Sequence, residues 1–349
     1  MDAPSDVHII DSMWVYANKY NADGDIIKCK ACLVVKGYTQ IPGLDYDQTY
    51  ASVVHLESFH MVAAIAAALD LQIWQVDNVT AYLYSTNKFT TYMCQPPGFV
   101  MQGEENKVLC IVKTLYSMMQ GGYNFQGEMS GAYESMGYYK SQANPCVHSQ
   151  MIGSEHTITS TYTNNIFRAS SMKEGAERAK REFEVCFEIK DVGDQGHILG
   201  IHLEKDKKMG VISLSQEAYL WCVLEWLGML YCNTKSTPLP LGTILFKSNS
   251  PKTDKGHHYM NNKLYWEVLG LCMWAQVTTC PDIAYALSVL AHFQANPRLA
   301  HWKAMLHLLV YLKGTINYKI TYHCGGSLNP IGFVNADYAG DIGGVFESI

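Results

Sequence analysis

Apolar and polar residues follow two different periods along this chain. Residues 71–77 alternate apolar and polar side chains and end at Asp77, which predicts a half-buried strand that presents an acid at its end. Residues 56–69 are alanine-rich and carry apolar side chains at helical spacing, so we expect a helix there. Residues 173–185 carry alternating charges, which favours a helix exposed to solvent. The pattern therefore predicts a mixture of strands and helices.

Turn-forming residues divide other apolar segments into hairpins. Residues 14–16 and 26–36 flank an Asp-Gly pair at 23–24, which is a strong hairpin signal. Residues 199–204 and 211–215 flank a polar, lysine-rich segment that ends in glycine, so we expect a second hairpin.

The C-terminal part is predominantly helical in its pattern. Residues 216–227 favour a helix with Gly228 as its stop. Residues 233–261 are rich in Thr, Pro, Ser and Lys, which indicates a linker or a long surface loop. The elements expected after it are helices over 264–276, 281–294 and 298–312 and strands over 318–322 and 331–334.

Length and composition are those of a globular protein. The chain has 349 residues, more than a single core usually supports, so we expect more than one domain. Hydrophobic residues make up 48% and charged residues 17%, which is ordinary for a chain that folds around a core. The net charge of −6 is unfavourable for binding a polyanion, although a local basic groove can coexist with an acidic total. We count it as weak evidence against active binding of nucleic acid.

Cysteine usage and hydropathy predict an intracellular protein, cytoplasmic or nuclear. The 11 cysteines are scattered, odd in number and without a secretory leader, which favours reduced thiols. Cys29 and Cys32 form a C-x-x-C without a second pair nearby, so we expect unpaired thiols on a strand and not a zinc site. The longest apolar stretch, at 61–71, is interrupted by Asp70 and is too short to span a bilayer. We expect no membrane contact.

Several sequence blocks together carry a specific resemblance. Residues 30–40 read KACLVVKGYTQ, close to the pattern K-A-R-L-V-A-K-G-[YF]-T-Q. Further blocks are IPGLDY at 41–46, QPPGF at 95–99, FEIKDVG at 187–193, ILGI at 198–201, PDIAYA at 281–286 and YLKGT at 311–315. Taken in this order, they resemble the polymerase region of copia-type retrotransposon polyproteins, from about residue 14 to the C-terminus.

The resemblance implies a fold. It predicts a right-hand α/β polymerase with fingers and palm, a helical thumb or connection region, and a truncated ribonuclease H strand. The regions it implies are an N-terminal extension at 1–13, fingers and palm at 14–232, a linker or surface loop at 233–261, a thumb or connection at 262–330, and a ribonuclease H start at 331–349.

The resemblance also implies a two-metal nucleotidyl transfer site, in which carboxylates hold two Mg²⁺ ions. Taken alone, Asp77 is best explained as a solvated acid at a strand end, but the resemblance makes it the first metal ligand. The other two acids belong to a Tyr-x-Asp-Asp turn, and that turn reads Tyr-Thr-Asn-Asn at 162–165. Amide oxygens can coordinate Mg²⁺ but bring no charge. Asn164 and Asn165 therefore predict a site that has lost most of its activity.

The resemblance assigns nucleotide contacts to Lys30, Lys36, Tyr82 and Gln120, with Tyr82 stacking under the incoming sugar and excluding ribose. Other positions differ from the family pattern. Met119 replaces a lysine, and arginines are replaced at four further positions, namely Cys32, His55, His60 and Cys280. Each change removes a cation from a protein whose ligand would be a polyanion.

Two further departures come from the family pattern. Arg168 and residues 159–161 stand where the family has a buried aliphatic run, and a buried unpaired arginine is costly, so we expect a locally distorted hairpin. Asn335 corresponds to the first metal-binding Asp of the ribonuclease H domain, and the chain stops at Ile349, before the remaining acids.

We therefore expect a copia-type reverse-transcriptase domain, an ancestral RNA-directed DNA polymerase, that is catalytically inactive. One alternative is a polymerase with residual activity that uses Asp77, amide ligands and manganese. The other is a domesticated module that binds nucleic acid or protein without chemistry. The implied partner is a template–primer duplex, and the implied cofactor is Mg²⁺, bound weakly or not at all.

Overall fold

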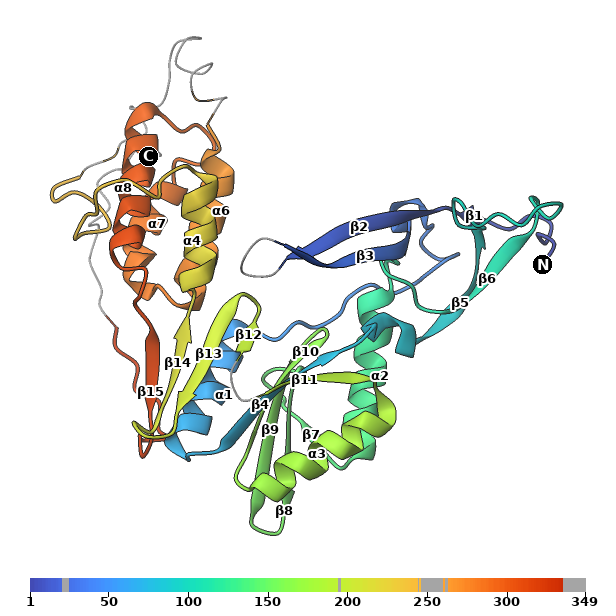
Figure 1. Cartoon of the computed structure of the whole chain (residues 1–349), viewed down its shortest axis with the longest axis horizontal. Helices are drawn as coiled ribbons and strands as arrows, with labels where there is room; N and C mark the ends of the chain where they lie inside the picture. Colours follow the sequence, from blue (N-terminus) through green and yellow to red (C-terminus); the bar gives the residue numbers. More distant parts are fainter. Residues whose placement is uncertain (21–24, 194–195, 244, 246–259, 261–262, 335–349) are drawn as a thin grey trace, which may run out of the picture. The chain divides into compact units, whose positions relative to one another are not determined.

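The computed structural model describes residues 1–20, 25–193, 196–243, 245, 260 and 263–334. The chain divides into two compact units. Unit 1 comprises Met1–Val62 and Gln72–Gly193, and unit 2 comprises Ala63–Leu71 and Asp194–Ile349. Figure 1 shows both with their elements labelled.

Unit 1 contains a six-stranded sheet with the strand order β11-β4-β10-β9-β8-β7, in which each pair of neighbouring strands is antiparallel over the described residues. Its strands are β4 (Gln72–Asn78), β7 (Tyr139–Lys140), β8 (Val147–Ile152), β9 (Glu155–Tyr162), β10 (Asn165–Ser170) and β11 (Ile189–Gly193). The strand predicted to end at Asp77 is confirmed as β4, but the prediction that it is half-buried is wrong, because residues 73–76 and Asn78 are all buried between the layers that cover the sheet.

Helices cover both faces of this sheet, because each face carries apolar side chains. Trp74 and Val76 of β4 and Ile166 of β10 pack with helices α2 (Gly121–Ser135) and α3 (Lys173–Cys186) in one core. The predicted helix over 56–69 is confirmed as α1 (Leu56–Ala68). The centroid of its Phe59 ring lies 5.4 Å from the ring centroid of Phe167 on β10. Since neighbouring residues of a strand point to opposite faces, Phe167 belongs to the face opposite α2 and α3.

Two smaller sheets complete unit 1. The hairpin of β2 (Ser12–Tyr20) and β3 (Ile26–Val35) confirms the first predicted hairpin, although its turn at 21–24 lies outside the described residues. The other sheet has the order β1-β5-β6. Its strands are β1 (Ile9–Ile10), β5 (Thr86–Cys94) and β6 (Val108–Lys113), and two short 3-10 helices are η1 (Gly37–Thr39) and η2 (Ala81–Tyr84).

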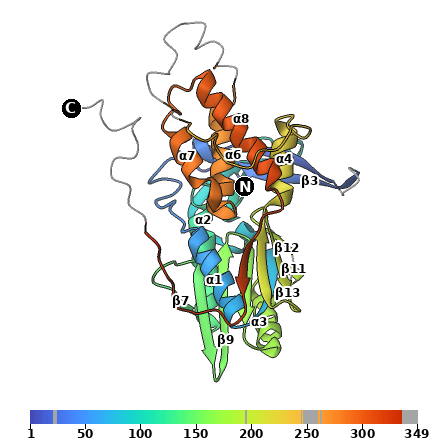
Figure 2. The same cartoon turned by 90° about the vertical axis from the view of Figure 1, so that its left-hand side faces the viewer.

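Unit 2 combines a four-stranded antiparallel sheet with a helical cluster. The sheet has the order β12-β13-β14-β15 and comprises β12 (Gly196–Ile198), β13 (Ile201–Asp206), β14 (Val211–Ser215) and β15 (Ile320–His323). The helices are α4 (Glu217–Trp226), α6 (Tyr265–Thr278), η4 (Pro281–Ile283), α7 (Ala284–Ala291) and α8 (Leu299–Gly314). They share one apolar core, and Figure 2 shows α6, α7 and α8 packed beside one another.

A buried lysine connects residues 63–71 to the sheet of unit 2. The Lys205 side chain on β13 is only 4% exposed, and its Nζ lies 2.6 Å from Asp70 Oδ1. The same Nζ donates a hydrogen bond to the backbone oxygen of Leu71 at 2.8 Å. Lys205 therefore stabilises the segment that follows α1.

Most sequence-predicted elements of unit 2 are confirmed: the second hairpin as β13 and β14, the helix over 216–227 as α4, and the three later helices as α6, η4 with α7, and α8. The strand predicted over 331–334 is wrong, because these residues form neither a helix nor a strand. Phe333 and Val334 are more than 90% exposed. Within the described part of the chain no strand pairs with residues 331–334, so a strand there would have no ladder to join.

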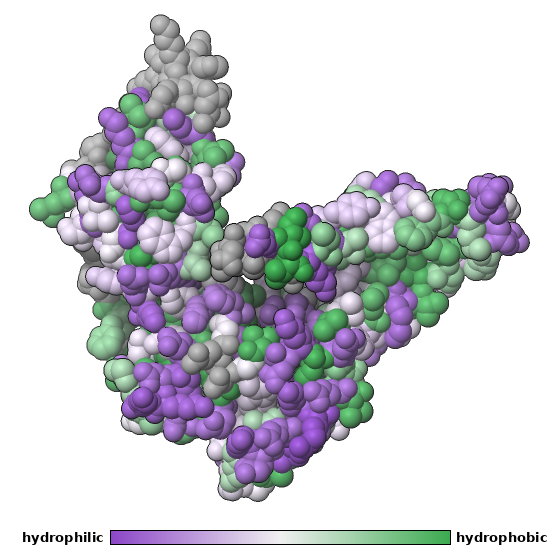
Figure 3. Space-filling model, viewed as in Figure 1, coloured by the Kyte–Doolittle hydropathy of each residue, from purple (hydrophilic) through white to green (hydrophobic). Residues whose placement is uncertain are grey.

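Polar residues cover α3, as predicted from its alternating charges. Figure 3 shows hydrophilic side chains over this helix, and the buried residues of α3 are confined to Gly175, Ala179 and Phe183. Among the residues that the structure describes, no helix has both the length and the apolar character needed to cross a bilayer.

Candidate active site

The β9–β10 hairpin brings the predicted site residues together. Asn165 pairs in register with Asp77 across the β10–β4 ladder. The turn before it is tight, since Tyr162 pairs with Asn165 and leaves only Thr163 and Asn164 between the strands. The backbone oxygen of Asn164 accepts a hydrogen bond from the amide of Asn78 at 2.8 Å, which ties the turn to the end of β4. Asp77, Asn164 and Asn165 therefore converge.

Hydrogen bonds join the three side chains into a chain. Asn164 Nδ2 donates to Asp77 Oδ1, and Asn165 Nδ2 donates to Asn164 Oδ1 at 3.3 Å. All three residues are partly exposed. The Asn164 side-chain amide therefore directs a hydrogen at the Asp77 carboxylate. A metal ion bound to Asp77 would need an oxygen ligand at this position instead.

This donor set does not fit two Mg²⁺ ions. Magnesium ions in such sites are balanced by several carboxylates. Here Asp77 is the one carboxylate among the three converging residues, and its oxygen is already bonded to Asn164. In the described part of the chain, no group of three or more His, Cys, Asp or Glu side chains is arranged to hold a metal ion.

Lys190 is a site residue that the sequence reasoning missed. It lies opposite Asp77 in the β11–β4 ladder, so Lys190, Asp77 and Asn165 form a row across three strands. The row carries one positive charge, one negative charge and one neutral amide. The family block at 187–193 contains Lys190, but only the register between β11 and β4 shows that Lys190 lies beside Asp77.

Tyr82 lies in η2, directly after β4. The centroid of its ring lies 5.0 Å from that of Tyr116 and 5.8 Å from that of Phe125, and both pairs pack edge to face. Burial raises the pKa of the Tyr82 hydroxyl. Tyr82 is thus held between the segment around Tyr116 and helix α2, and it also lines a cavity described below.

Gln120 uses its side chain within the protein. It is 3% exposed, and its Oε1 accepts a hydrogen bond from Gln40 Nε2 at 3.1 Å. Its Nε2 donates to Asn87 Oδ1 and to the backbone oxygen of Asp45, both at 3.2 Å. Gln40 Oε1 in turn accepts from the Met119 amide. These bonds fasten the block at 30–40 to the block around Gln120.

The same two blocks meet at a close backbone contact. A Cβ atom built on Gly37 would lie 1.9 Å from the backbone oxygen of Ser117. Ser117 itself has φ +68°, a left-handed conformation that favours glycine. The backbones of the two blocks are therefore in direct contact at Gly37 and Ser117.

The two predicted lysines lie on β3 and at its end. Lys30 is exposed on β3. Lys36 forms an ion pair with Asp11 at 3.1 Å, and its hydrogen bond to Asp11 raises the pKa of Lys36. Cys29 and Cys32 both lie on β3, as expected for thiols on a strand. Asn335 lies outside the described residues.

The distortion expected around Arg168 is not observed. Arg168 is 1% exposed, yet β10 keeps an unbroken register with both β4 and β9 from Asn165 to Ser170. The guanidinium lies 4.2 Å from the Phe183 ring centroid and donates to the Ala179 backbone oxygen at 3.1 Å. Aromatic faces and a carbonyl of α3 thus replace the missing carboxylate, although Nε has no partner among the described residues.

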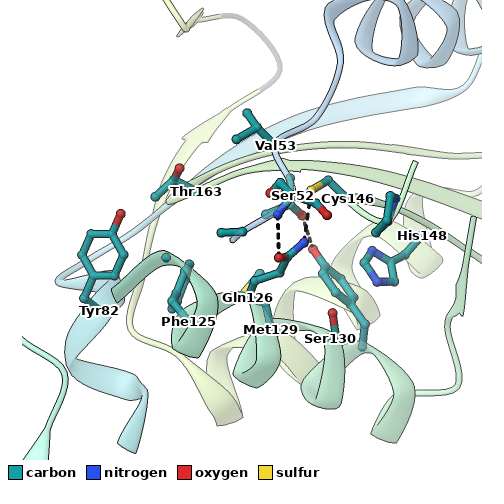
Figure 4. Close-up of a pocket in the computed structure, with 15 residues that line it drawn as sticks. Ser52, Val53, Tyr82, Phe125, Gln126, Met129, Ser130, Cys146, His148 and Thr163 are labelled. Atoms are coloured by element: carbon teal, nitrogen blue, oxygen red, sulfur yellow. Dashed lines mark hydrogen bonds between the residues drawn. The ribbon is translucent and has the colours of Figure 1, made fainter. Parts of the chain in front are cut away.

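A cavity of about 180 Å³ lies in unit 1 between α2 and the segments that face it (Figure 4). Helix α2 contributes Phe125, Gln126, Met129, Ser130 and Tyr133. The same helix adds Gly122, and the facing residues are Ala51, Ser52, Val53, Tyr82, Pro145, Cys146, His148, Thr161 and Thr163.

Known proteins are similar to this chain over nearly all of its length. A family model described as reverse transcriptase (RNA-dependent DNA polymerase) matches residues 1–240. The retrovirus-related Pol polyprotein from transposon TNT 1-94 of Nicotiana tabacum is 32% identical over 345 residues, which is 98% of this chain and 26% of the relative.

Two proteins of Arabidopsis thaliana are similar over nearly the same range. The retrovirus-related Pol polyprotein from transposon RE1 is 29% identical, over 97% of this chain and 22% of the relative. The one from transposon RE2 is 27% identical, over 97% of this chain and 23% of the relative. The chain thus spans about a quarter of the length of these relatives.

Proposed function

Because this chain belongs to the reverse-transcriptase family of copia-type retrotransposon Pol polyproteins, we propose that it is a reverse-transcriptase domain that has lost catalysis. Its ancestral activity is RNA-directed DNA synthesis by two-metal nucleotidyl transfer. The domain keeps the fold and the convergence of the site, and it lacks the charge that the metal ions need.

The hydrogen bond from Asn164 to Asp77 is the observation that carries this proposal. An aspartate at 164 would repel Asp77, and a metal ion between them would relieve the repulsion. The asparagine instead satisfies Asp77 directly, so the site is stable without an ion. Lys190 in the same row of strands lowers the attraction for a cation further.

The expected loss of rate is large. Electrostatic contributions of single groups at such sites are worth roughly 3–4 kcal/mol each, and every 1.4 kcal/mol is about tenfold in rate. Two lost carboxylates therefore predict a reduction of several orders of magnitude.

The neighbouring segments take corresponding ancestral roles. We assign fingers and palm to 14–232, a thumb or connection to the helices within 262–330, and a ribonuclease H start to 331–349. The ancestral partner is a template–primer duplex, for which Lys30, Lys36, Tyr82 and Gln120 are the proposed nucleotide contacts. For Gln120, nucleotide contact requires that its bonds to Gln40 and Asn87 open first.

Primer extension tests the proposal. On an RNA template with Mg²⁺ or with Mn²⁺, the purified chain should extend the primer no more than the Asp77→Ala variant does. The double variant Asn164→Asp/Asn165→Asp serves as the matched control that restores the carboxylates. Extension by the unmodified chain that disappears in Asp77→Ala would show residual polymerase activity and overturn the inactive assignment.

Binding without chemistry is measured separately. Fluorescence anisotropy with a labelled template–primer duplex, at several salt concentrations, reports whether contacts to the phosphates remain, because such binding weakens steeply with salt. Salt-dependent binding without extension identifies a nucleic-acid-binding module that has lost its chemistry.

A further inference from the structure

Two histidines lie directly opposite each other at the edge of the sheet in unit 2. His197 of the edge strand β12 pairs with His202 of β13 (Figure 1). Only Leu199 and Gly200 separate the two strands, and their φ angles of +56° and +76° are those of a tight type I′ hairpin turn. Because the turn type and loop length set the register of a hairpin, this turn fixes the two histidines opposite each other.

The hairpin geometry brings the two imidazole rings close together. In a two-residue hairpin the residues next to the loop form the hydrogen-bonded pair, so the following pair is the non-hydrogen-bonded one, in which side chains lie closest. His197 and His202 form that pair, and their ring centroids lie 4.9 Å apart. Two imidazoles that share a tetrahedral metal ion, with metal–nitrogen bonds of about 2.0–2.1 Å, have ring centroids roughly 5 Å apart. The observed separation therefore suits a shared ion.

Both imidazoles are accessible to a ligand. His197 is exposed and His202 is partly buried. Among the described residues no hydrogen bond engages either ring, and neither nitrogen of His202 is closed off from solvent. Burial and the neighbouring His197 lower the pKa of His202, so its ring is unprotonated at neutral pH. An unprotonated imidazole offers the lone pair that a metal ion needs.

Charged side chains surround His202 on the polar face of the sheet. Glu204 and Glu217 lie near enough to attract a cation, whereas Lys319 repels one. The Glu204 carboxylate forms an ion pair with Lys319 at 3.2 Å, so it is already engaged. The site therefore offers two protein nitrogens, in agreement with the absence of any group of three His, Cys, Asp or Glu ligands among the described residues. Water molecules would complete the coordination of an ion.

We propose that His197 and His202 together bind a divalent transition-metal ion that prefers imidazole, such as Zn²⁺ or Ni²⁺. Imidazole nitrogens suit these ions, whereas Mg²⁺ takes oxygen ligands, so the site differs in chemistry from a polymerase site. The ion links the edge strand β12 to β13. The site uses residues of unit 2 alone, whereas Asp77, Asn164 and Asn165 belong to unit 1, so it stands or falls separately from the loss of catalysis.

Isothermal titration calorimetry of the untagged full chain with Ni²⁺ at pH 7.5 tests the site. Ni²⁺ is the probe because imidazole suits it and, unlike Cu²⁺, it does not oxidise thiols. The unmodified chain should show saturable binding that a large excess of Mg²⁺ does not displace. His197→Gln and His202→Gln should each weaken this binding by about tenfold or more, since changing a group that merely orients a metal ligand already costs about that much.

Two control variants remove other histidines. His323→Gln changes an exposed histidine on β15 of the same sheet, whose partner across the ladder is Val211 and not a histidine. The double variant His257→Gln/His258→Gln removes the pair that is adjacent in the sequence. Both controls should bind Ni²⁺ as the unmodified chain does. Weakening in a control that equals the weakening in His197→Gln would place the ion elsewhere and overturn the proposal.

The other outcomes are equally decisive. Absence of saturable Ni²⁺ binding by the unmodified chain would overturn the site, and weakening in only one of His197→Gln and His202→Gln would overturn the shared ion. If His202→Gln fails to fold, modification of the unmodified chain by diethyl pyrocarbonate, mapped by mass spectrometry, replaces it. Ni²⁺ should then protect both His197 and His202 from the reagent, and protection of neither or of only one would contradict the proposal.

Discussion

Asn164→Asp is the substitution that most directly reverses the change at the site. In the present chain Asn164 Nδ2 donates to Asp77 Oδ1. An aspartate at 164 has no hydrogen to donate, so the variant loses this bond and places two carboxylates side by side. Without a metal ion, we expect the folded state to be less stable than that of the unmodified chain.

The size of the effect follows from the contact. Two unit charges about 4 Å apart repel by about 4 kcal/mol at an effective dielectric constant of about 20. Both residues are partly exposed, and screening by water lowers the repulsion to roughly 1–2 kcal/mol. The lost hydrogen bond adds about 1–2 kcal/mol, which gives a total of about 2–4 kcal/mol. At about 2–4 °C per kcal/mol, the melting temperature should fall on the order of 5–10 °C.

Asn165→Asp is the matched control. Asn165 lies opposite Asp77 in the strand register, but its side chain bonds to Asn164 and not to Asp77, at a long 3.3 Å. Its replacement should therefore cost about 1 kcal/mol or less. Because an aspartate at 165 would also lie opposite Asp77, the difference between the two variants measures the hydrogen bond that Asn164 donates to Asp77.

Thermal unfolding followed by circular dichroism measures both variants. The difference in melting temperature between Asn164→Asp and the unmodified chain should shrink as the pH falls from 7 to 4, because protonation of one carboxylate removes the repulsion. Millimolar Mg²⁺ should raise its melting temperature and leave the unmodified chain unchanged, since only the folded variant offers paired carboxylates. Equal melting temperatures for the two variants at pH 7, or no response of Asn164→Asp to Mg²⁺, would refute the reasoning.

Four further predictions concern the framework of the fold and are each read out by thermal unfolding. Gly37→Ala should destabilise by more than about 3 kcal/mol, because its Cβ would overlap a backbone oxygen, whereas Gly131→Ala on α2, with open space around it, should stabilise by up to about 1 kcal/mol. Ser117→Gly should stabilise by about 1 kcal/mol by relieving the left-handed conformation; a loss of stability would show that Ser117 is not strained. Lys205→Met should cost about 1–3 kcal/mol and affect unit 2 first, since it removes both the ion pair with Asp70 and the buried hydrogen bond to Leu71; an unchanged melting curve would contradict the role of Lys205. Acid should destabilise the chain through His148, whose pKa is lowered to about 4: the stability it contributes is present above pH 6.5 and is lost as pH falls towards 4, so His148→Phe should show a smaller dependence on pH in that window.

Much of the arrangement at the site follows from the sequence because it depends on local pattern. Alternation over 71–77 is enough to place Asp77 at a strand end, and the helical spacing over 56–69 predicts α1 almost to the residue. The convergence of Asp77 with the Asn-Asn turn follows from the family resemblance, and the ladder between β4 and β10 has the required register.

Other features depend on contacts that no local pattern encodes. The position of Lys190 beside Asp77 requires the register between β11 and β4. The bonds of Gln120 to Gln40 and Asn87 join side chains that are 80 and 33 residues apart in the chain. Arg168 is accommodated because α3 offers a ring face and a carbonyl at the right place, and nothing in the strand itself predicts them.

Manganese binding to the purified chain, measured by electron paramagnetic resonance, is the most direct test of the loss of the metal site. Mn²⁺ takes the same oxygen ligands as Mg²⁺, and its free signal disappears on binding. The unmodified chain should bind no more Mn²⁺ than Asp77→Ala does, whereas Asn164→Asp/Asn165→Asp should gain saturable binding. Saturable binding by the unmodified chain that is lost in Asp77→Ala would contradict the loss of the site.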